Sequence, residues 1–306
     1  MNKLVSVIMS IYNEDDEWLH QSIKSILNQT YSYFEFIIVI DNPDNEHIKR
    51  IISDYKNKDD RIKVILNEKN LGLVASLNRA LEYCNGYYVA RMDADDISYN
   101  DRFEKQIKYL ENNNLDCVMS YIDKIDENGN ILTRSKNSKD IGVQQFMNLM
   151  KYCNIATHPT WLMKKDVYSD LKGYRNINKC EDYDFMLRAL QAKYNISKMK
   201  DSLLFYRVRK SSITQKNVLE QYYNSKYLRK KYQQNTDISK LNKVDIEKNY
   251  CSLNNLKIEN FYHDYACFKT NKILCTFFAM VNDAIFRNYI IDNLKITFMI
   301  WKNSRR

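Results

Sequence analysis

Three carboxylates stand within four positions, directly after an apolar run in the first third of the chain. The run 87–92 reads YYVARM, and Asp93, Asp95 and Asp96 follow it. Like charges this close together repel one another, and they lower stability unless something neutralises them. A bound cation or the solvent could neutralise them. Which of the two does so depends on the residues that the surrounding elements place beside the aspartates.

The elements that must position these carboxylates alternate between strand and helix over the first 120 residues. Apolar runs of strand length occur at 4–11, 34–40, 62–66, 87–92 and 116–121, and segments with helical periodicity separate them. This alternation predicts a mostly parallel α/β sheet with helices on both faces. Sheets of this kind bind ligands at the carboxyl ends of their strands.

Polar residues follow three of these strands at that edge. The first strand runs into Ser10–Glu14, the second ends in Asp41–Asn42, and the fourth leads into the aspartates. No GxGxxG or GxxxxGK[ST] motif follows any strand, so a glycine-rich phosphate loop is not expected. Mg²⁺ or Mn²⁺ on the aspartates is the natural substitute, because both ions favour carboxylate and phosphate oxygens.

The alternation ends after residue 121. Asn128–Gly129 suits the turn of a hairpin, and a helix with three acids in its first turn begins at Glu181. A last strand is expected from Ser202, and from about residue 215 the pattern is helical and basic.

The excess of positive over negative charge lies in the last third of the chain. The formal net charge is +9, but residues 1–201 hold 28 Lys and Arg against 30 Asp and Glu, whereas 202–306 hold 19 against 8. Such a region can contact nucleic acid, an anionic membrane or an acidic ligand, or be a solvated helical surface.

The apolar run 273–281 is far shorter than the roughly 20 residues that span a bilayer. Seven scattered cysteines without metal-site spacing favour a reducing compartment.

Six segments, in this order, resemble the family 2 glycosyltransferases with the GT-A fold. They are VSVIMSIYNE, FIIVIDN, NEKNLGLVASLN, YVARMDADD, HPTWLMKKDVY with GYRN, and CEDYDFMLR. The resemblance covers about Leu4 to Val208, and it is strongest to enzymes that build bacterial O-antigen, capsule or other surface polysaccharides. It implies a GT-A (Rossmann-like) mixed, mostly parallel sheet flanked by helices. A catalytic domain would span 1–210, with a nucleotide-sugar half at 1–121 and an acceptor half at 122–210, followed by a helical basic region at 211–306.

The resemblance also implies roles for individual residues. Asp95 would hold Mn²⁺ or Mg²⁺ against the donor diphosphate, and Asp182 would act as the general base. The donor nucleotide would be bound by Ser10, Tyr12, Glu14, Asp41, Asn78 and Asp93. Within that set, Asp41 would contact the uracil ring and Asp93 would lie near the ribose. The chain departs from the family pattern at Asn42–Pro43, where DDGS is common after the second strand, and at Leu77, where many members have Arg.

The implied reaction is an inverting transfer of a hexose or N-acetylhexosamine from a UDP-sugar to a saccharide acceptor, with undecaprenyl-diphosphate-linked glycan as the acceptor class. The enzyme would be cytoplasmic and peripheral at the inner face of the membrane, with its basic tail on anionic lipid and no nucleic acid bound. Two other functions fit part of the sequence, a basic nucleic-acid-binding protein and a nucleotide-sugar-forming nucleotidyltransferase. The first leaves the ordered acids unexplained, and the second needs a glycine-rich basic loop where the chain reads SIYNEDDEW.

Several single residues have a second interpretation. Asp96 is expected to cap the next helix and not to bind metal, and Arg91 to form a structural salt bridge. Tyr12 is either a core residue or a stacking partner for the base. His158 is either structural or close to the acceptor, and the charges at the start of the helix that holds Asp182 could serve the helix dipole alone.

Overall fold

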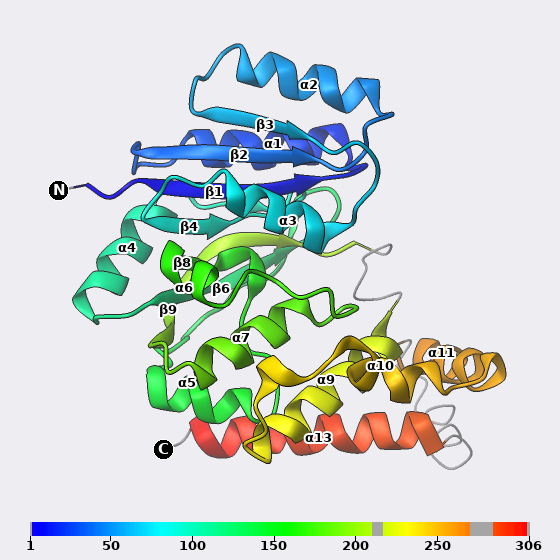
Figure 1. Ribbon diagram of the computed structural model, residues 1–306. Coiled ribbons are helices and arrows are strands. Elements are labelled where there is room, and N and C mark those ends of the chain that lie inside the picture. The colour runs from blue at the N-terminus through cyan, green and yellow to red at the C-terminus, as the bar shows by residue number, and fades with distance from the viewer. Residues whose placement is uncertain (1, 210–216, 270–283, 305–306) are drawn as a thin grey trace. The chain divides into compact units, whose positions relative to one another are not determined.

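The computed structural model describes residues 2–209, 217–269 and 284–304, and a mixed β-sheet forms its largest element (Figure 1). Along the sheet the strand order is β3-β2-β1-β4-β8-β6-β9-β5, and β7 pairs with β6. The strands are β1 Val5–Ile11, β2 Phe34–Ile40, β3 Ile62–Leu66, β4 Tyr88–Arg91, β5 Ile97–Ser98, β6 Cys117–Ile125, β7 Ile131–Thr133, β8 Leu162–Lys164 and β9 Ile196–Arg207.

Most of the strands run in the same direction, as the sequence predicts, although only half of the strand pairs are parallel. β1 runs parallel to both β2 and β4, β2 runs parallel to β3, and β6 runs parallel to β9. The other pairs are antiparallel, namely β8 with β4 and β6, β5 with β9, and β7 with β6. All seven residues of β2 are buried, which is typical of a strand covered on both faces. The hairpin expected at Asn128–Gly129 is confirmed by the antiparallel pair β6 and β7.

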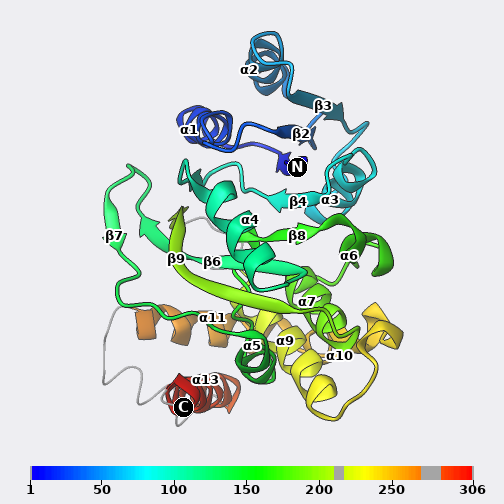
Figure 2. The ribbon, with the colours of Figure 1, turned by 90° about the vertical axis from the view of Figure 1, so that its left-hand side faces the viewer.

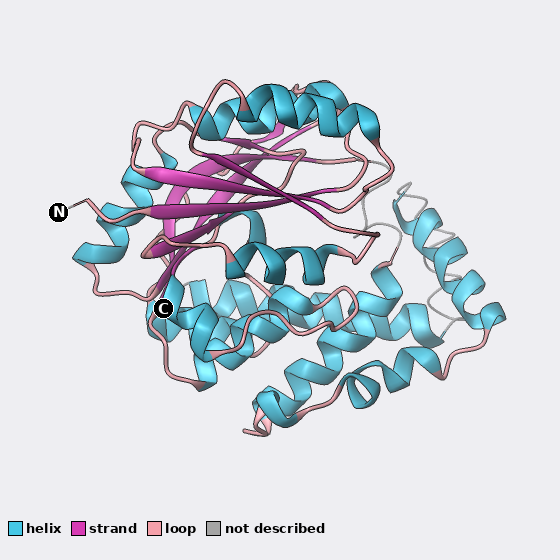
Figure 3. Cartoon of the chain, turned by 45° about the horizontal axis from the view of Figure 1, so that its top comes forward, coloured by secondary structure: helices cyan, strands magenta, loops and turns pink. Residues whose placement is uncertain are grey.

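Helices cover both faces of the sheet (Figure 3), and α1 and α3 lie on opposite sides of β1 and β2 (Figure 2). The helices that follow the strands are α1 Asp16–Leu27, α2 Glu46–Lys56, α3 Leu73–Glu82, α4 Arg102–Asn112, α5 Val143–Met150, α6 Lys165–Asp170 and α7 Glu181–Gln191. Asp15 caps α1, since its side chain accepts hydrogen bonds from the backbone N–H groups of Glu17 and Trp18. Leu19, Ile23 and Ile26 of α1 are fully buried, so this apolar face packs into the core.

The chain divides into two compact units. The sheet unit comprises 1–146, 156–176 and 181–212, and the helical unit comprises 147–155, 177–180 and 213–306. The expected domain boundary at 210/211 lies outside the described residues, as does the apolar run 273–281.

The helical unit confirms the helical character expected of the last third of the chain. Its helices are α9 Val218–Gln233, α10 Lys243–Cys251, α11 Asn255–Lys269 and α13 Ala284–Ser304. Its core is small and largely aromatic, and is formed by Leu219, Tyr222, Phe261, Phe286 and Ile290. In the parts of the chain that are described, no helix combines the length and the apolar character needed to cross a bilayer.

Candidate active site

The carboxyl ends of three neighbouring strands meet at one edge of the sheet. β1 lies between β2 and β4 in register, with Ile11 opposite Ile40 and Ile8 opposite Arg91. The polar segments that follow these strands therefore reach the same edge, as predicted from their positions in the sequence. The structure thus brings the acids after β1 and β4 into one electrostatic environment, in which the charge of Asp95 acts on Glu14.

The three aspartates after β4 form a cluster that could hold a metal ion. One carboxylate oxygen from each of Asp93, Asp95 and Asp96 lies within 4.8 Å of the others. Asp96 is fully buried, and its Oδ1 accepts a hydrogen bond from the backbone N–H of Arg207 at 2.9 Å. Its Oδ2 is buried and has no hydrogen-bond partner in the described chain. An unpartnered buried carboxylate oxygen beside two further carboxylates suits a hard divalent cation.

The expected capping role of Asp96 is wrong. Helix α4 begins at Arg102, and Asp101 occupies its N-cap position. Asp96 is held instead by β9, a strand that comes about a hundred residues later in the chain. It therefore belongs with the cluster and not with the helix.

Burial raises the pKa values of three acids at this edge, Glu14, Asp95 and Asp96. It raises the pKa of Asp95 to about 6, and the neighbouring charge of Asp93 adds to the increase. The pKa of Asp96 is well above its usual range because of burial and the charges of Asp95 and Asp93. Burial also raises the pKa of Glu14 to about 7, although this carboxylate accepts a hydrogen bond from the Tyr12 backbone N–H at 2.8 Å. Burial and mutual repulsion therefore disfavour the charged forms of these acids, and a bound cation would offset that cost.

Two arginines already pair with the cluster. Buried Arg91 forms an ion pair with Asp93, which confirms the salt bridge expected of it. Arg209, just after β9, places its Nε 2.8 Å from Oδ2 of Asp95, and its side chain is 26% exposed. Arg209 is more accessible than Arg91. An incoming ligand can therefore displace Arg209 from Asp95, or bind to it, at a lower cost in free energy.

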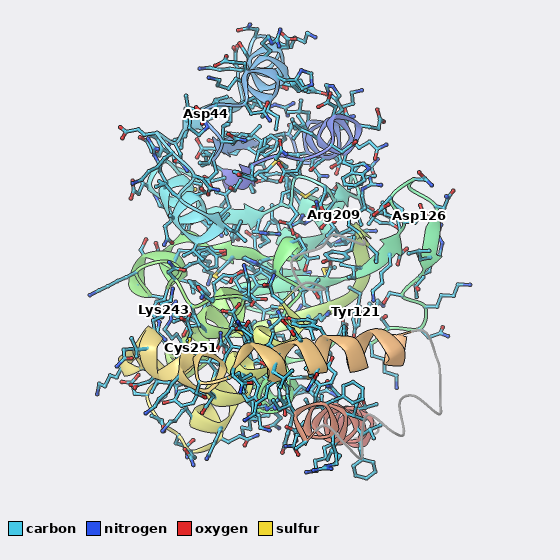
Figure 4. The ribbon with its side chains drawn as sticks, turned by 90° about the vertical axis from the view of Figure 1, so that its right-hand side faces the viewer. Asp44, Tyr121, Asp126, Arg209, Lys243 and Cys251 are labelled. Atoms are coloured by element: carbon cyan, nitrogen blue, oxygen red, sulfur yellow. The ribbon has the colours of Figure 1, made fainter. Side chains whose placement is uncertain are left out.

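Arg207 and Arg209 are site residues that sequence reasoning missed. Besides its backbone contact to Asp96, Arg207 donates from Nε to the backbone carbonyl of Asp95 at 2.9 Å. Both guanidinium groups lie over the ring of Trp18, at 5.2 and 5.8 Å from its centroid. Figure 4 labels Arg209 and also Asp126, which follow the neighbouring strands β9 and β6. The available signal was the sequence YRVR at the carboxyl end of the last strand, the same position in a strand that revealed the aspartates.

Ser10 and Tyr12, two of the residues assigned to the donor nucleotide, differ in how exposed their side chains are. Tyr12 is 48% exposed just beyond β1, and Ser10 is half-buried within that strand. Exposure excludes the core interpretation of Tyr12 and leaves its ring available for stacking.

Asp41 anchors the loop that leads into α3. Its carboxylate accepts hydrogen bonds from the Asn67 side chain at 2.7 Å and from the backbone N–H groups of Leu71 and Gly72, both at 2.8 Å. Gly72 adopts φ +83°, a conformation that favours glycine. Asp41 is itself only 3% exposed, so its observed role is to hold this loop in place.

Asn78 does not join the carboxylate cluster. Its Nδ2 donates to the backbone carbonyl of Tyr174, and its Oδ1 accepts from the Tyr174 N–H, each at 2.8 Å. These two bonds fix the backbone at 174, and the assignment of Asn78 to the donor nucleotide stays a prediction.

Asp182 is the second residue of α7 and is half-buried. One of its oxygens accepts from the backbone N–H of Tyr183 at 2.6 Å. Burial raises the pKa of the Tyr174 hydroxyl, and the charges of Arg91, Glu181 and Asp182 also act on it. Arg91 in turn pairs with Asp93, so the acids of α7 share an electrostatic neighbourhood with the cluster. Asp184, by contrast, is fully buried between Arg175 and Arg188 and has a structural role.

His158 lies in a buried aromatic cluster. Its Nε2 is 2.9 Å from the Tyr174 hydroxyl, and its ring centroid is 4.4 Å from that of Trp161. Burial, reinforced by the positive charge of Arg91, holds its pKa well below the usual range. A neutral, packed imidazole of this kind favours the structural interpretation of His158.

The sheet topology and the acids at its carboxyl edge define the class of protein as the GT-A glycosyltransferases. Staphylococcus aureus TarS, solved as residues 1–349 in complex with UDP-GlcNAc, shares this fold with a TM-score of 0.61 at 20% sequence identity, over 79% of this chain and 69% of that one. The chain belongs to glycosyl transferase family 2, whose family model matches residues 6–172.

Relatives agree with this assignment. An uncharacterized glycosyltransferase of Methanocaldococcus jannaschii is 43% identical over 209 residues, which cover 67% of this chain and 71% of that protein. The O-antigen biosynthesis glycosyltransferase WbnJ of Escherichia coli is 37% identical over 73% of this chain and 87% of its own length. The amylovoran biosynthesis glycosyltransferase AmsE of Erwinia amylovora is 33% identical over 66% of this chain and 75% of its own length. The family drawn from the sequence motifs is therefore confirmed, and the protein is a glycosyltransferase and not a nucleotidyltransferase.

Proposed function

We propose that this glycosyltransferase performs a metal-dependent, inverting transfer of a hexose or N-acetylhexosamine from a UDP-sugar to a saccharide acceptor. The observation that carries the proposal is the cluster of Asp93, Asp95 and Asp96, with the raised pKa values of Asp95 and Asp96 and the unpartnered buried oxygen of Asp96. The TarS structure with UDP-GlcNAc supports a nucleotide sugar as the donor.

The cluster would hold Mn²⁺ or Mg²⁺, with Asp95 as the principal ligand. Bound there, the ion would act as a Lewis acid that neutralises charge on the diphosphate leaving group, a contribution of several kcal/mol. Arg91 keeps Asp93 in place from the buried side. Arg209 supplies a second positive group that can turn from Asp95 to a phosphate oxygen.

In this proposal Asp182 removes the proton from the acceptor hydroxyl. As the acceptor oxygen bonds to the anomeric carbon, its proton passes to the Asp182 carboxylate. The bond between that carbon and the diphosphate oxygen breaks, and UDP leaves with the electron pair. Attack from the face opposite the leaving group inverts the anomeric centre, so a single carboxylate base suffices and no covalent intermediate is needed.

The relatives named for O-antigen and amylovoran biosynthesis support a role in a surface polysaccharide. For such a product we propose an undecaprenyl-diphosphate-linked acceptor, met at the cytoplasmic face of the membrane. Helix α13 offers a surface for that contact, since Ile291, Leu294 and Phe298 are 39%, 65% and 59% exposed at helical spacing. Exposed Arg287 and Lys295 stand on the same helix. Apolar and basic side chains together suit an anionic membrane surface.

The reaction is tested by measuring UDP release from a panel of UDP-sugars in the presence of lipid-linked acceptor glycans. At least one sugar should give acceptor-dependent release that stops with excess chelator and returns with Mn²⁺ or Mg²⁺. Transfer with retained anomeric configuration, or transfer that persists in chelator, would contradict the mechanism while leaving the family assignment intact.

A further inference from the structure

A cavity of about 480 Å³ lies within the helical unit, along one side of α9. It is lined by three lysines, two tyrosines and two carboxamide side chains, and its lining residues include no carboxylate. Six of the seven come from α9 and the residue after it, and Asn249 comes from α10. None of them belongs to the carboxylate cluster or to the donor site proposed above.

The lysines gather on α9 because of their spacing. Lys226 and Lys230 are four residues apart and so share one face of the helix, Lys231 follows directly after them, and all three line the cavity. Like charges at i and i+4 lower helix stability by a few tenths of a kcal/mol. The repulsion between these lysines therefore lowers the stability of α9 slightly, and a bound anion would remove that repulsion.

The three ammonium groups are not equivalent. Nζ of Lys226 is 2.6 Å from Oδ2 of Asp292 and donates to the Tyr222 hydroxyl at 2.8 Å. Lys231 lies over the ring of Tyr227, with Nζ 5.5 Å from its centroid. Lys230 is exposed and has no acidic partner among the described residues. Lys230 and Lys231 are therefore the two cations available to a ligand, and the contact with Tyr227 orients one of them.

We propose that this cavity binds a phosphate ester, with Lys230 and Lys231 on the phosphate and the tyrosines against the group that it carries. Ammonium groups bind phosphate as point charges. The ring of Tyr227 and the side chains of Gln234 and Asn249 supply an aromatic face and hydrogen-bonding groups for a polar ring such as a sugar. The volume falls within the range of pockets that take small molecules. The phosphate can come from a soluble sugar phosphate or from a lipid headgroup, and the two sources share this chemistry.

The test titrates the full chain with inorganic pyrophosphate by calorimetry, in chelator and at low salt. The variant K230A/K231A removes both available charges, and K248A/K257A removes the same charge from exposed positions on α10 and α11. We expect the pyrophosphate Kd to rise roughly tenfold or more in K230A/K231A, because charge-assisted contacts are lost. The control variant should stay within about twofold, and thermal unfolding should show that both variants fold.

A second arm uses sedimentation with vesicles of phosphatidylglycerol and phosphatidylcholine to separate the two sources. A pyrophosphate response that depends on Lys230 and Lys231 assigns the site to soluble phosphate esters. A dependence seen only with vesicles assigns it to a lipid headgroup. If K230A/K231A matches K248A/K257A in both arms, or if the wild-type chain binds neither probe, α9 is a solvated charged face and the proposal is overturned.

Discussion

The carboxylate cluster of the sheet unit and the lysine cavity of the helical unit concentrate charge in opposite ways. Asp96 is fully buried and is held by a backbone N–H from β9, whereas Lys230 is exposed on the helix that supplies most of its neighbours. The lysines come together through local helical spacing, whereas the aspartates are neighbours in the chain that owe their burial and their partners Arg207 and Arg209 to tertiary structure. Burial raises the pKa values of the acids, so their charge is costly without a cation. Exposed lysine charge is screened by salt and adds little to stability.

This difference predicts how each region responds to mutation and to solution conditions. Changes at the buried cluster should alter catalysis by orders of magnitude. Changes on the basic surfaces should alter binding modestly and in a salt-dependent way.

The largest effect is expected from Asp95→Asn. The substitution keeps the size of the side chain and removes a charged ligand from the cluster, so transfer should fall by about 10³-fold or more. Steady-state UDP release measures this. Asp54→Asn, on the exposed face of α2, is the matched control and should retain activity. Wild-type turnover in Asp95→Asn would remove this residue from the metal site.

Asp182→Asn is expected to have the next largest effect. It removes the proton acceptor, so transfer should fall by roughly 10²–10⁴-fold. Donor affinity, followed by UDP-sugar titration with Mn²⁺, should stay nearly unchanged. Glu181→Gln, one residue earlier in the same turn, should cost much less. If donor affinity drops in step with turnover, Asp182 binds the donor and is not the base.

The membrane surface should respond to salt. Binding to anionic vesicles at low salt should weaken about tenfold or more at high salt, because exposed charges are screened over about 8 Å at physiological ionic strength. Leu294→Asn on α13 should weaken binding, while Val244→Asn should not, although Val244 on α10 is 76% exposed and Leu294 65%. Co-sedimentation measures both. Equally negligible binding to anionic and neutral vesicles at low salt would rule out a membrane-docking surface.

The smallest effect concerns stability against pH. The folded-state pKa values of Asp95, about 6, and Glu14, about 7, lie above their ordinary values of 3.8 and 4.5. The folded state therefore holds protons that the unfolded state has lost, and these groups make the metal-free protein less stable as pH rises from about 4 to 7. Thermal unfolding should show Mn²⁺ raising Tm by several degrees at pH 7.5 and by much less at pH 5, because protons compete for the ligands. An equal Mn²⁺ effect at both values would argue against ion binding at these carboxylates.

Much of the sheet unit follows from the sequence. The runs at 4–11, 34–40 and 62–66 are apolar throughout or nearly so, and the helical patterns between them force a parallel arrangement. The acids after β1, β2 and β4 could be assigned to one edge before any coordinates, because the carboxyl ends of neighbouring parallel strands coincide. The same local logic predicted the helical, basic last third.

What the sequence determined by itself were properties set by periodicity and by chain direction, namely the elements, the carboxylate edge and the family of the enzyme. Tertiary structure alone decided which partners meet those residues. The residues around Asp96 in the chain suggest a helix cap, but its carboxylate accepts a hydrogen bond from the backbone N–H of Arg207 in β9. The amide of Asn78 is bonded to the backbone of Tyr174, a partner that its neighbours in the chain do not indicate. Arg209 reaches Asp95 although more than a hundred residues separate them. Such contacts depend on how distant segments pack in three dimensions, and no local pattern of residues encodes that packing.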